Sequence, residues 1–294
     1  MNLDLRGFGG ASNPGRAASR LCRSLMLGLV AVLATACAGV PASPPVVDPM
    51  SMPHVHALVT NPADGSLLAG THEGVVRIED GKAVPVGTSR QDIMGLAMAG
   101  PDRFYASGHP EPGASGPPHL GLIASNDGAK TWSSVSLAGQ ADFHTLVPTT
   151  AGLYGYNSVK STLMFSKNRT KWTDLLTAAL YDIAADPNDP THLLLTAETG
   201  VRDYRVGTPP ADVPETKGVA FIEWVDKQNV VGLTISGEVK VSPDGGQTWS
   251  QRGTVDGDIE ALGVGPAAWH VATTEGIFAS TDGGRTWDRI LGSP

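Results

Sequence analysis

A short polar turn that ends in tryptophan, termed here the Ser-Asp turn, occurs in three nearly complete copies. They read SNDGAKTW (125–132), SPDGGQTW (242–249) and STDGGRTW (280–287). The last two copies begin 38 residues apart. A degenerate copy, SKNRTKW, begins at Ser166, which is 41 residues after the start of the first copy and 76 residues before Ser242. Because 76 is twice 38, the spacing predicts a further unit in that gap, and self-similarity at a fixed period of this length indicates a repeat architecture.

Two further units have lost most of the turn, one near GVRDYRVG (200–207) and one at VVRIEDGKAV (75–84). Four short strands in each period of about 40 residues, with glycine-rich punctuation, are typical of a propeller blade. We therefore predict an all-β fold, a β-propeller of six four-stranded blades with the Ser-Asp turn between strands three and four. A β-sandwich with extra strands is the alternative, but it gives no reason for a fixed period. The predicted units span about 54–88, 92–137, 142–176, 180–208, 217–253 and 258–292.

Every residue type in the Ser-Asp turn has a structural task. An Asp carboxylate accepts hydrogen bonds from the backbone N–H groups that follow it, and glycine supplies the positive φ of a tight hairpin. The tryptophan offers a large area for burial against the neighbouring blade. We expect structural roles for Ser125, Asp127, Trp132, Ser242, Asp244, Gly246, Trp249, Ser280, Asp282, Gly284 and Trp287.

These turns resemble the Asp-box (BNR) repeats of sialidases, other glycoside-hydrolase propellers, sortilin-type receptors and a photosystem assembly factor. Over residues 54–292 the chain, with stretches such as HVHALVTNPADGSLLAGTHEG, also resembles actinobacterial exported proteins labelled glycosyl hydrolases. The resemblance implies a propeller in which the box is architectural, so it implies no catalysis by Asp127, Asp244 or Asp282. The label glycosyl hydrolase rests on fold analogy, so it is weak evidence for a catalytic activity.

The N-terminal region has the pattern of an export signal. Arg16, Arg20 and Arg23 precede the apolar run SLMLGLVAVLATA (24–36), which is too short for a stable membrane-spanning helix. Cys37 follows directly, and the arrangement resembles a bacterial lipoprotein signal in which this cysteine is lipidated, although Ala34 stands where leucine is more usual. The alternative is a secretory signal cleaved near Ala36 or Ala38.

These features predict a signal peptide over 1–36, a Pro/Ser-rich tether over 37–53 and the propeller over 54–292. The expected location is the extracytoplasmic face of the cell membrane, with contact to the membrane only through the lipid. Removal of residues 1–36 would leave 28 acidic and 17 basic residues and one cysteine, hence no internal disulfide. An acidic chain without a basic stripe is a poor nucleic-acid binder. We expect a monomer whose candidate partners are a glycan, a small ligand or an envelope protein.

The first strand of each predicted blade lines the central channel, so we aligned the six strand starts. Because side chains alternate along a strand, one face should pack between blades, namely Val55, Ile93, Phe143, Tyr181, Val219 and Ile259. Five of the eight histidines fall at the channel mouth or its rim: His54, His56, His72, His109 and His144. The predicted ligand-binding residues are His54, His56, Asp92, Met94, His109, Asp142, His144, Tyr156, Asp182 and Glu260.

Several functions fit this mouth. Imidazole and carboxylate suit Zn²⁺ or Cu²⁺, with His54, His56, His144 and His109 as candidate ligands, and Met94 would favour copper. A glycosidase would instead use two carboxyl groups, drawn from Asp92, Asp142, Asp182, Asp258 and Glu260. No arginine lies at an inner-strand start, which argues against a true sialidase. An interaction scaffold would use the rim loop 109–121, and a solvated polar funnel would need no ligand.

Overall fold

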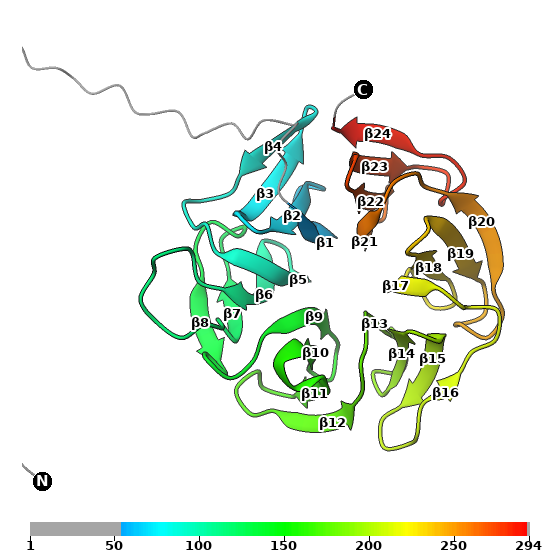
Figure 1. The fold of residues 1–294 in the computed structure, drawn as a ribbon, viewed down its shortest axis with the longest axis horizontal. Coiled ribbons are helices and arrows are strands. Elements are labelled where there is room, and N and C mark those ends of the chain that lie inside the picture. Colours follow the sequence, from blue (N-terminus) through cyan, green and yellow to red (C-terminus); the bar gives the residue numbers. More distant parts are fainter. Residues whose placement is uncertain (1–53, 293–294) are drawn as a thin grey trace, which may run out of the picture. The chain divides into compact units, whose positions relative to one another are not determined.

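The computed structural model describes residues 54–292, which form six four-stranded antiparallel sheets around a central channel (Figure 1). The signal peptide, Cys37 and the tether lie outside the described residues. The all-β fold and the six-bladed propeller are confirmed, and in every blade the strands follow one another in chain order. No helix within 54–292 is long and apolar enough to cross a membrane.

Blade one comprises β1 (Val55–Thr60), β2 (Leu67–Thr71), β3 (Gly74–Glu79) and β4 (Lys82–Pro85). Blade two comprises β5 (Asp92–Gly100), β6 (Arg103–His109), β7 (Leu122–Ser125) and β8 (Ser133–Ser136). Blade three comprises β9 (Phe143–Pro148), β10 (Leu153–Asn157), β11 (Thr162–Ser166) and β12 (Thr173–Thr177). A short 3-10 turn, η2 (Ser158–Lys160), follows β10.

Blade four comprises β13 (Ile183–Ala185), β14 (His192–Ala197), β15 (Gly200–Arg205) and β16 (Ala211–Asp212). Blade five comprises β17 (Val219–Trp224), β18 (Val230–Thr234), β19 (Glu238–Ser242) and β20 (Ser250–Thr254). Blade six comprises β21 (Ile259–Val264), β22 (Trp269–Thr273), β23 (Gly276–Ser280) and β24 (Asp288–Leu291). The fourth strand of blade four lies beyond residue 208, where the sequence predicted that unit to end.

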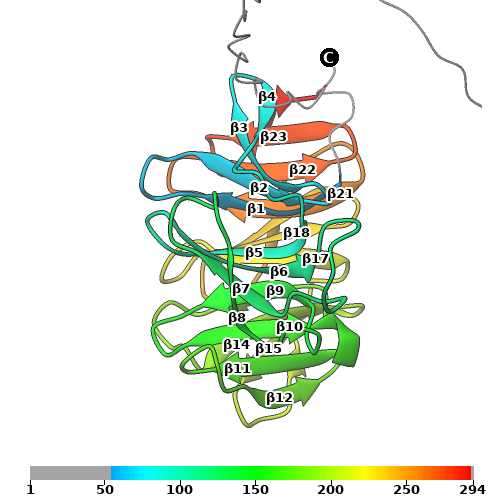
Figure 2. The ribbon, with the colours of Figure 1, turned by 90° about the vertical axis from the view of Figure 1, so that its left-hand side faces the viewer.

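The core is divided among the interfaces between blades. Each of the six hydrophobic clusters joins one blade to the next. The cluster between blades one and six contains Val55 and Leu58 from one side and Ile277 and Leu291 from the other. β1 lies beside β21 in both views (Figures 1 and 2). Among the described residues the ring therefore closes by side-chain packing between blades, without exchange of a strand.

Tyr181 departs from the inter-blade face predicted for it. Its backbone N–H donates to the Thr196 carbonyl at 2.9 Å, as pairing of the inner strand requires. Its side chain is nevertheless 55% exposed, and Leu180, 6% exposed, packs into the cluster between blades three and four. The interpretation fails because β13 starts only at Ile183, so the residues before it do not follow the alternation of a regular strand.

The three Ser-Asp turns share one hydrogen-bond pattern. In the copy between β19 and β20, the Ser242 hydroxyl donates to Asp244 Oδ1 at 2.8 Å and accepts from the Gly246 N–H at 2.8 Å. Asp244 also accepts from the N–H and the hydroxyl of Thr248, at 2.8 and 2.6 Å. These bonds, led by that from the Thr248 hydroxyl, lower the pKa of Asp244 to about 2. The turn thus satisfies its own polar groups.

Each turn also packs against the preceding blade. Gly246 has a φ of +88°, and a Cβ on it would lie 2.6 Å from the Leu194 side chain of blade four. Trp249 lies in the cluster between blades four and five, and its indole N–H donates to the Gly246 carbonyl at 2.9 Å. The tryptophans of the other copies lie at the corresponding interfaces: Trp132, Trp172 and Trp287.

The buried Ser242 gives a direct test of the turn. Ser242→Ala should leave the buried Gly246 N–H without an acceptor, and we expect the free energy of unfolding to fall by about 1–3 kcal/mol. Ser250→Ala, at an exposed position whose side chain has no hydrogen bond to any residue of 54–292, is the matched control and should change it by less than about 0.5 kcal/mol. Urea unfolding measures both, and equal effects would contradict the role given to the turn.

Candidate functional site

A β-bulge occurs at the start of the inner strand in five blades. Pairing with the second strand skips one residue, so each bulged residue has no partner directly opposite. The bulged residues are His56, Met94, His144, Ala220 and Glu260. In blade four Asp182 holds the same place, because the Tyr181 N–H donates to the Thr196 carbonyl and the Thr196 N–H donates to the Asp182 carbonyl. Bulges are common next to active sites, where they redirect side chains.

Five of these six positions, all except Ala220, open onto a cavity of about 550 Å³ in the channel. His56, Met94, His144, Asp182 and Glu260 all line it. No lysine or arginine is among its lining residues in the described part of the chain. Carboxylates without basic neighbours favour cations and disfavour anionic ligands.

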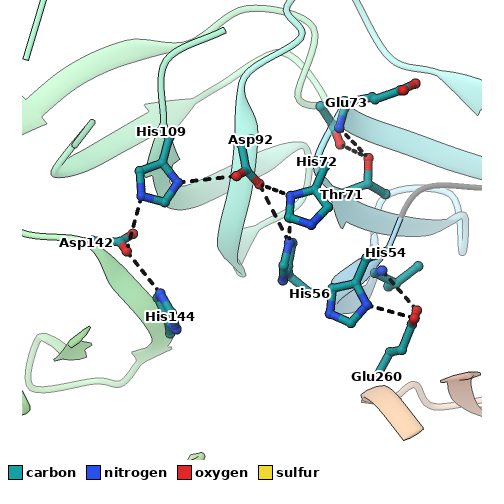
Figure 3. Close-up of polar contacts among 12 residues, drawn as sticks. His54, His56, Thr71, His72, Glu73, Asp92, His109, Asp142, His144 and Glu260 are labelled. Atoms are coloured by element: carbon teal, nitrogen blue, oxygen red, sulfur yellow. Dashed lines mark hydrogen bonds and ion pairs between the residues drawn. The ribbon is translucent and has the colours of Figure 1, made fainter. Parts of the chain in front are cut away.

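At the mouth, imidazoles and carboxylates alternate in a continuous chain (Figure 3). Asp92 Oδ1 lies 3.0 Å from His72 Nδ1, and Asp92 Oδ2 lies 3.3 Å from His109 Nδ1. Asp142 Oδ2 then lies 3.5 Å from His109 Nε2 and 3.0 Å from His144 Nε2. These five residues, from blades one, two and three, are termed the His–Asp chain.

His56 joins the chain at its blade-one end. Its Nε2 lies 3.3 Å from His72 Nδ1 and 3.6 Å from Asp92 Oδ1. Burial, then the charges of His54 and His72, lower the pKa of His56 to about 4, although Asp92 acts against this. His56 is therefore a neutral imidazole at physiological pH, the form that binds metal ions.

His54 pairs with blade six instead. Its Nδ1 lies 2.7 Å from Glu260 Oε1, and the Val55 N–H donates to Glu260 Oε2 at 3.0 Å. Its ring also stands edge-on to that of His56, with centroids 4.7 Å apart. His54 and Glu260 thus connect the first blade to the last at the mouth.

Asp142 is the most enclosed acid of the His–Asp chain, at 4% exposure. Burial alone would raise its pKa, but the hydrogen bond and charge of His144, with the hydrogen bond of the Ser158 hydroxyl, hold the pKa of Asp142 below its usual value. Ser158 donates to Oδ2 at 3.0 Å, whereas Oδ1 is buried and has no partner among the described residues. One oxygen of this acid is therefore unsatisfied.

The structure brings together most of the site residues predicted from the sequence. The residues that meet at the mouth are His54, His56, His72, Asp92, His109, Asp142, His144 and Glu260. Met94 lines the cavity beside them. Asp182 also lines the cavity, but it accepts from the Ile183 and Ile222 N–H groups at 2.8 and 3.0 Å. Its carboxylate thus ties blade four to blade five.

Two predicted residues lie elsewhere. Tyr156, expected at the rim, is 7% exposed in the cluster between blades three and four, where its hydroxyl donates to the Ala178 carbonyl at 3.2 Å. It fails as a ligand candidate because its strand turns that side chain into the interface. Asp258 is exposed and does not line the cavity, since it precedes the first residue of β21.

The sequence analysis missed His119. It stands at the far end of the rim loop from His109, and the two rings lie with centroids 5.4 Å apart. The sequence contained a signal for this contact, because β6 and β7 are neighbouring strands and the loop that joins them must bring its two ends, and so His109 and His119, together. The Leu120 N–H indeed donates to the Gly108 carbonyl at 2.8 Å.

Glu223 was missed as well. It lies three residues after the bulged position of β17, where the other five units have Val59, Ala97, Val147, Ala185 and Gly263. Burial, then the charge of Asp182, raise the pKa of Glu223 to about 8, and burial raises the pKa of Asp182 to about 6.

Two groups of side chains offer ligand atoms within 4.8 Å of one another, the spacing that a metal ion can bridge. One group comprises His56, His72 and Asp92, and the other comprises His109, His119 and Asp142. Both lie at the channel mouth, and the bond between His109 and Asp92 joins them.

No protein-family model and no curated protein matches this chain. Among solved structures, the GH74 enzyme of Niastella koreensis is 17% identical with a TM-score of 0.59, covering 82% of this chain and 38% of its own. The GH74 xyloglucanase of Xanthomonas campestris is 17% identical with a TM-score of 0.52, covering 82% and 40%. The WD40 β-propeller domain of Doa1 is 10% identical with a TM-score of 0.52, covering 82% and 83%. This chain therefore spans about two fifths of the GH74 chains, and the likeness shows the propeller fold alone.

Glu223 provides a pH test of the channel. The pKa of Glu223 is about 8 in the folded protein and 4.5 ordinarily, so between these values the folded chain holds a proton that the unfolded chain releases. Rising pH should therefore lower the free energy of unfolding of the wild type relative to Glu223→Gln, from about pH 4.5 to about pH 8. Urea unfolding across this range measures the difference. A difference that is constant with pH would contradict the raised pKa.

Proposed function

We propose that this protein binds a divalent transition-metal ion, Zn²⁺ or Cu²⁺, through His56, His72 and Asp92 at the channel mouth. The observation that carries the proposal is the spacing of His56 Nε2, His72 Nδ1 and Asp92 Oδ1, at 3.0, 3.3 and 3.6 Å. Four ligands about 2.0–2.1 Å from a tetrahedral ion lie about 3.3–3.4 Å apart. The three atoms thus match one face of such a tetrahedron.

The surroundings support a metal ligand set in three further ways. His56 is neutral, so its ring nitrogen can donate a lone pair to a cation. Asp92 uses its second oxygen to contact His109, and such outer contacts orient ligands around bound metals. The cavity below has acidic side chains and no lysine or arginine among its lining residues in 54–292.

Three protein ligands would leave one coordination position of the ion for water or for a ligand donor in the cavity. Sites of this composition, with two imidazoles and one carboxylate, are typical of accessible rather than purely structural zinc. We therefore propose a role in binding, in which the ion is either the cargo or the means of holding a small ligand. His72, half-exposed at the rim, gives the ion a route in from solvent.

A glycoside hydrolase is less well supported by the same residues. Asp92, Asp142 and Glu260 each contact an imidazole, and Asp182 accepts two backbone N–H groups. Asp258 lies outside the cavity lining. A pair of free carboxyl groups, which glycoside hydrolysis requires, would have to include Glu223.

We further propose export and lipid anchoring at Cys37, which would place the mouth in the cell envelope. The apolar run 24–36 and the cysteine that follows it support this. The acidic balance of residues 37–294 suits a protein that meets metal ions outside the cytoplasm.

Removal of a ligand should abolish tight binding at the site formed by His56, His72 and Asp92. Loss of an outer contact typically weakens metal affinity 10–100-fold, so His72→Ala and His56→Gln should each weaken Zn²⁺ binding at this site by at least about 100-fold. His270→Gln, which alters a histidine of β22 outside both clusters, should leave the affinity unchanged. Isothermal titration calorimetry measures all three, and a titration of His72→Ala that matches the wild type in both stoichiometry and affinity would contradict the proposal.

Lipid anchoring predicts a label that depends on one cysteine. In a bacterial host that processes lipoproteins, a fatty-acid analogue should label the wild type and Cys22→Ala but not Cys37→Ala. Gel fluorescence after metabolic labelling reads this out. Label retained in Cys37→Ala would show that the segment is not a lipoprotein signal.

A further inference from the structure

We propose a second metal site at His109, His119 and Asp142, so that the channel mouth holds two divalent transition-metal ions in adjacent sites. This inference rests on the proposed function, because it extends metal binding from one side of Asp92 to the other. His119 supplies the third ligand of this second site. It lies outside every inner strand and reaches the mouth from the rim loop.

Two unsatisfied groups mark the site. Asp142 is 4% exposed, and its Oδ1 has no hydrogen-bond partner in the described part of the chain. His119 Nδ1 is likewise buried without a partner there. A buried acceptor without a partner costs about 1–3 kcal/mol, more when it is charged. A cation that bound Asp142 Oδ1 and His119 Nδ1 would remove that cost.

The remaining geometry fits a metal ion. His109 Nε2 lies 3.5 Å from Asp142 Oδ2, close to the separation of ligand atoms on one ion. His109, His119 and Asp142 each offer one ligand atom, and these three atoms lie within 4.8 Å of one another. His144 Nε2, 3.0 Å from Asp142 Oδ2, orients the carboxylate from the opposite side. The site therefore has two imidazoles, one carboxylate and an outer contact.

The chain around His119 is held in place. The Gly139 N–H donates to the His119 carbonyl at 2.8 Å, and the Leu120 N–H donates to the Gly108 carbonyl at 2.8 Å. Gly121 has a φ of +64°, and a Cβ on it would lie 2.3 Å from the Ser136 carbonyl oxygen. The loop end that carries His119 is thus fixed by backbone contacts on both sides.

The two sites share one hydrogen bond. His109 Nδ1 lies 3.3 Å from Asp92 Oδ2, so a proton on Nδ1 leaves Nε2 free for the second ion. Asp92 Oδ1 is meanwhile a ligand of the first ion. An imidazole that binds metal through one nitrogen usually donates the other N–H to a carboxylate. His109 therefore acts as a ligand in one site and as an orienting contact in the other.

The stoichiometry of Zn²⁺ binding tests this inference separately from the proposed function. After equilibrium dialysis against Zn²⁺, mass spectrometric metal analysis should find two ions per wild-type chain. His119→Ala and His72→Ala should each retain one ion, the double variant none, and His270→Gln two. His109→Ala should lose the second ion and weaken the first by about 10–100-fold.

Each other result has a distinct meaning. The second site alone would be overturned if the wild type bound one ion, and that ion was kept by His119→Ala and lost by His72→Ala. It would also be overturned if His119→Ala still bound two ions. One ion that His72→Ala keeps would overturn the first site, and no ion in the wild type would overturn both. Thermal unfolding checks that each variant is folded, and His119→Gln replaces His119→Ala should the latter not fold.

Discussion

Packing between neighbouring blades is the constraint on which the rest of this structure depends. His56 and His144 lie 88 residues apart in the chain and meet the same cavity only because the two interfaces between blades one, two and three are closed by side chains. The sixth interface, between blades one and six, fixes the ring without any exchanged strand. Apolar burial of this kind is non-directional, so the Ser-Asp turns supply the fixed geometry at its outer edge.

The inner-strand bulge converts this ring into a site. A regular strand would alternate its side chains between the two blade faces, whereas in four of the five bulged strands the unpaired residue directs its side chain to the channel. Blade four reaches the same arrangement with Asp182, through its backbone bonds with Thr196. The chemical group that each blade presents to the channel therefore depends on which residue occupies the bulged position of its inner strand.

The period of the Ser-Asp turn was sufficient to predict the blade number and the strand order. The alignment of the six strand starts was sufficient to predict five residues that line the cavity, namely His56, Met94, His144, Asp182 and Glu260. It could not predict Tyr156 or Tyr181, because an aromatic side chain beside a channel can turn either into an interface or into solvent. It also missed His119, whose approach to His109 depends on the closed ends of the loop 109–121. Glu223 was missed because only the starts of the six inner strands were aligned, and Glu223 lies just beyond the aligned segment of its strand.

The central claim is that the ring brings His56, His72 and Asp92 together as ligands of one ion. Anomalous diffraction at the zinc edge from crystals grown with Zn²⁺ tests it most directly. The account predicts a peak bonded to His56 Nε2, His72 Nδ1 and Asp92 Oδ1, with the three side chains placed as in Figure 3. A mouth without an anomalous peak in such crystals, or zinc held only at surface carboxylates, would contradict it.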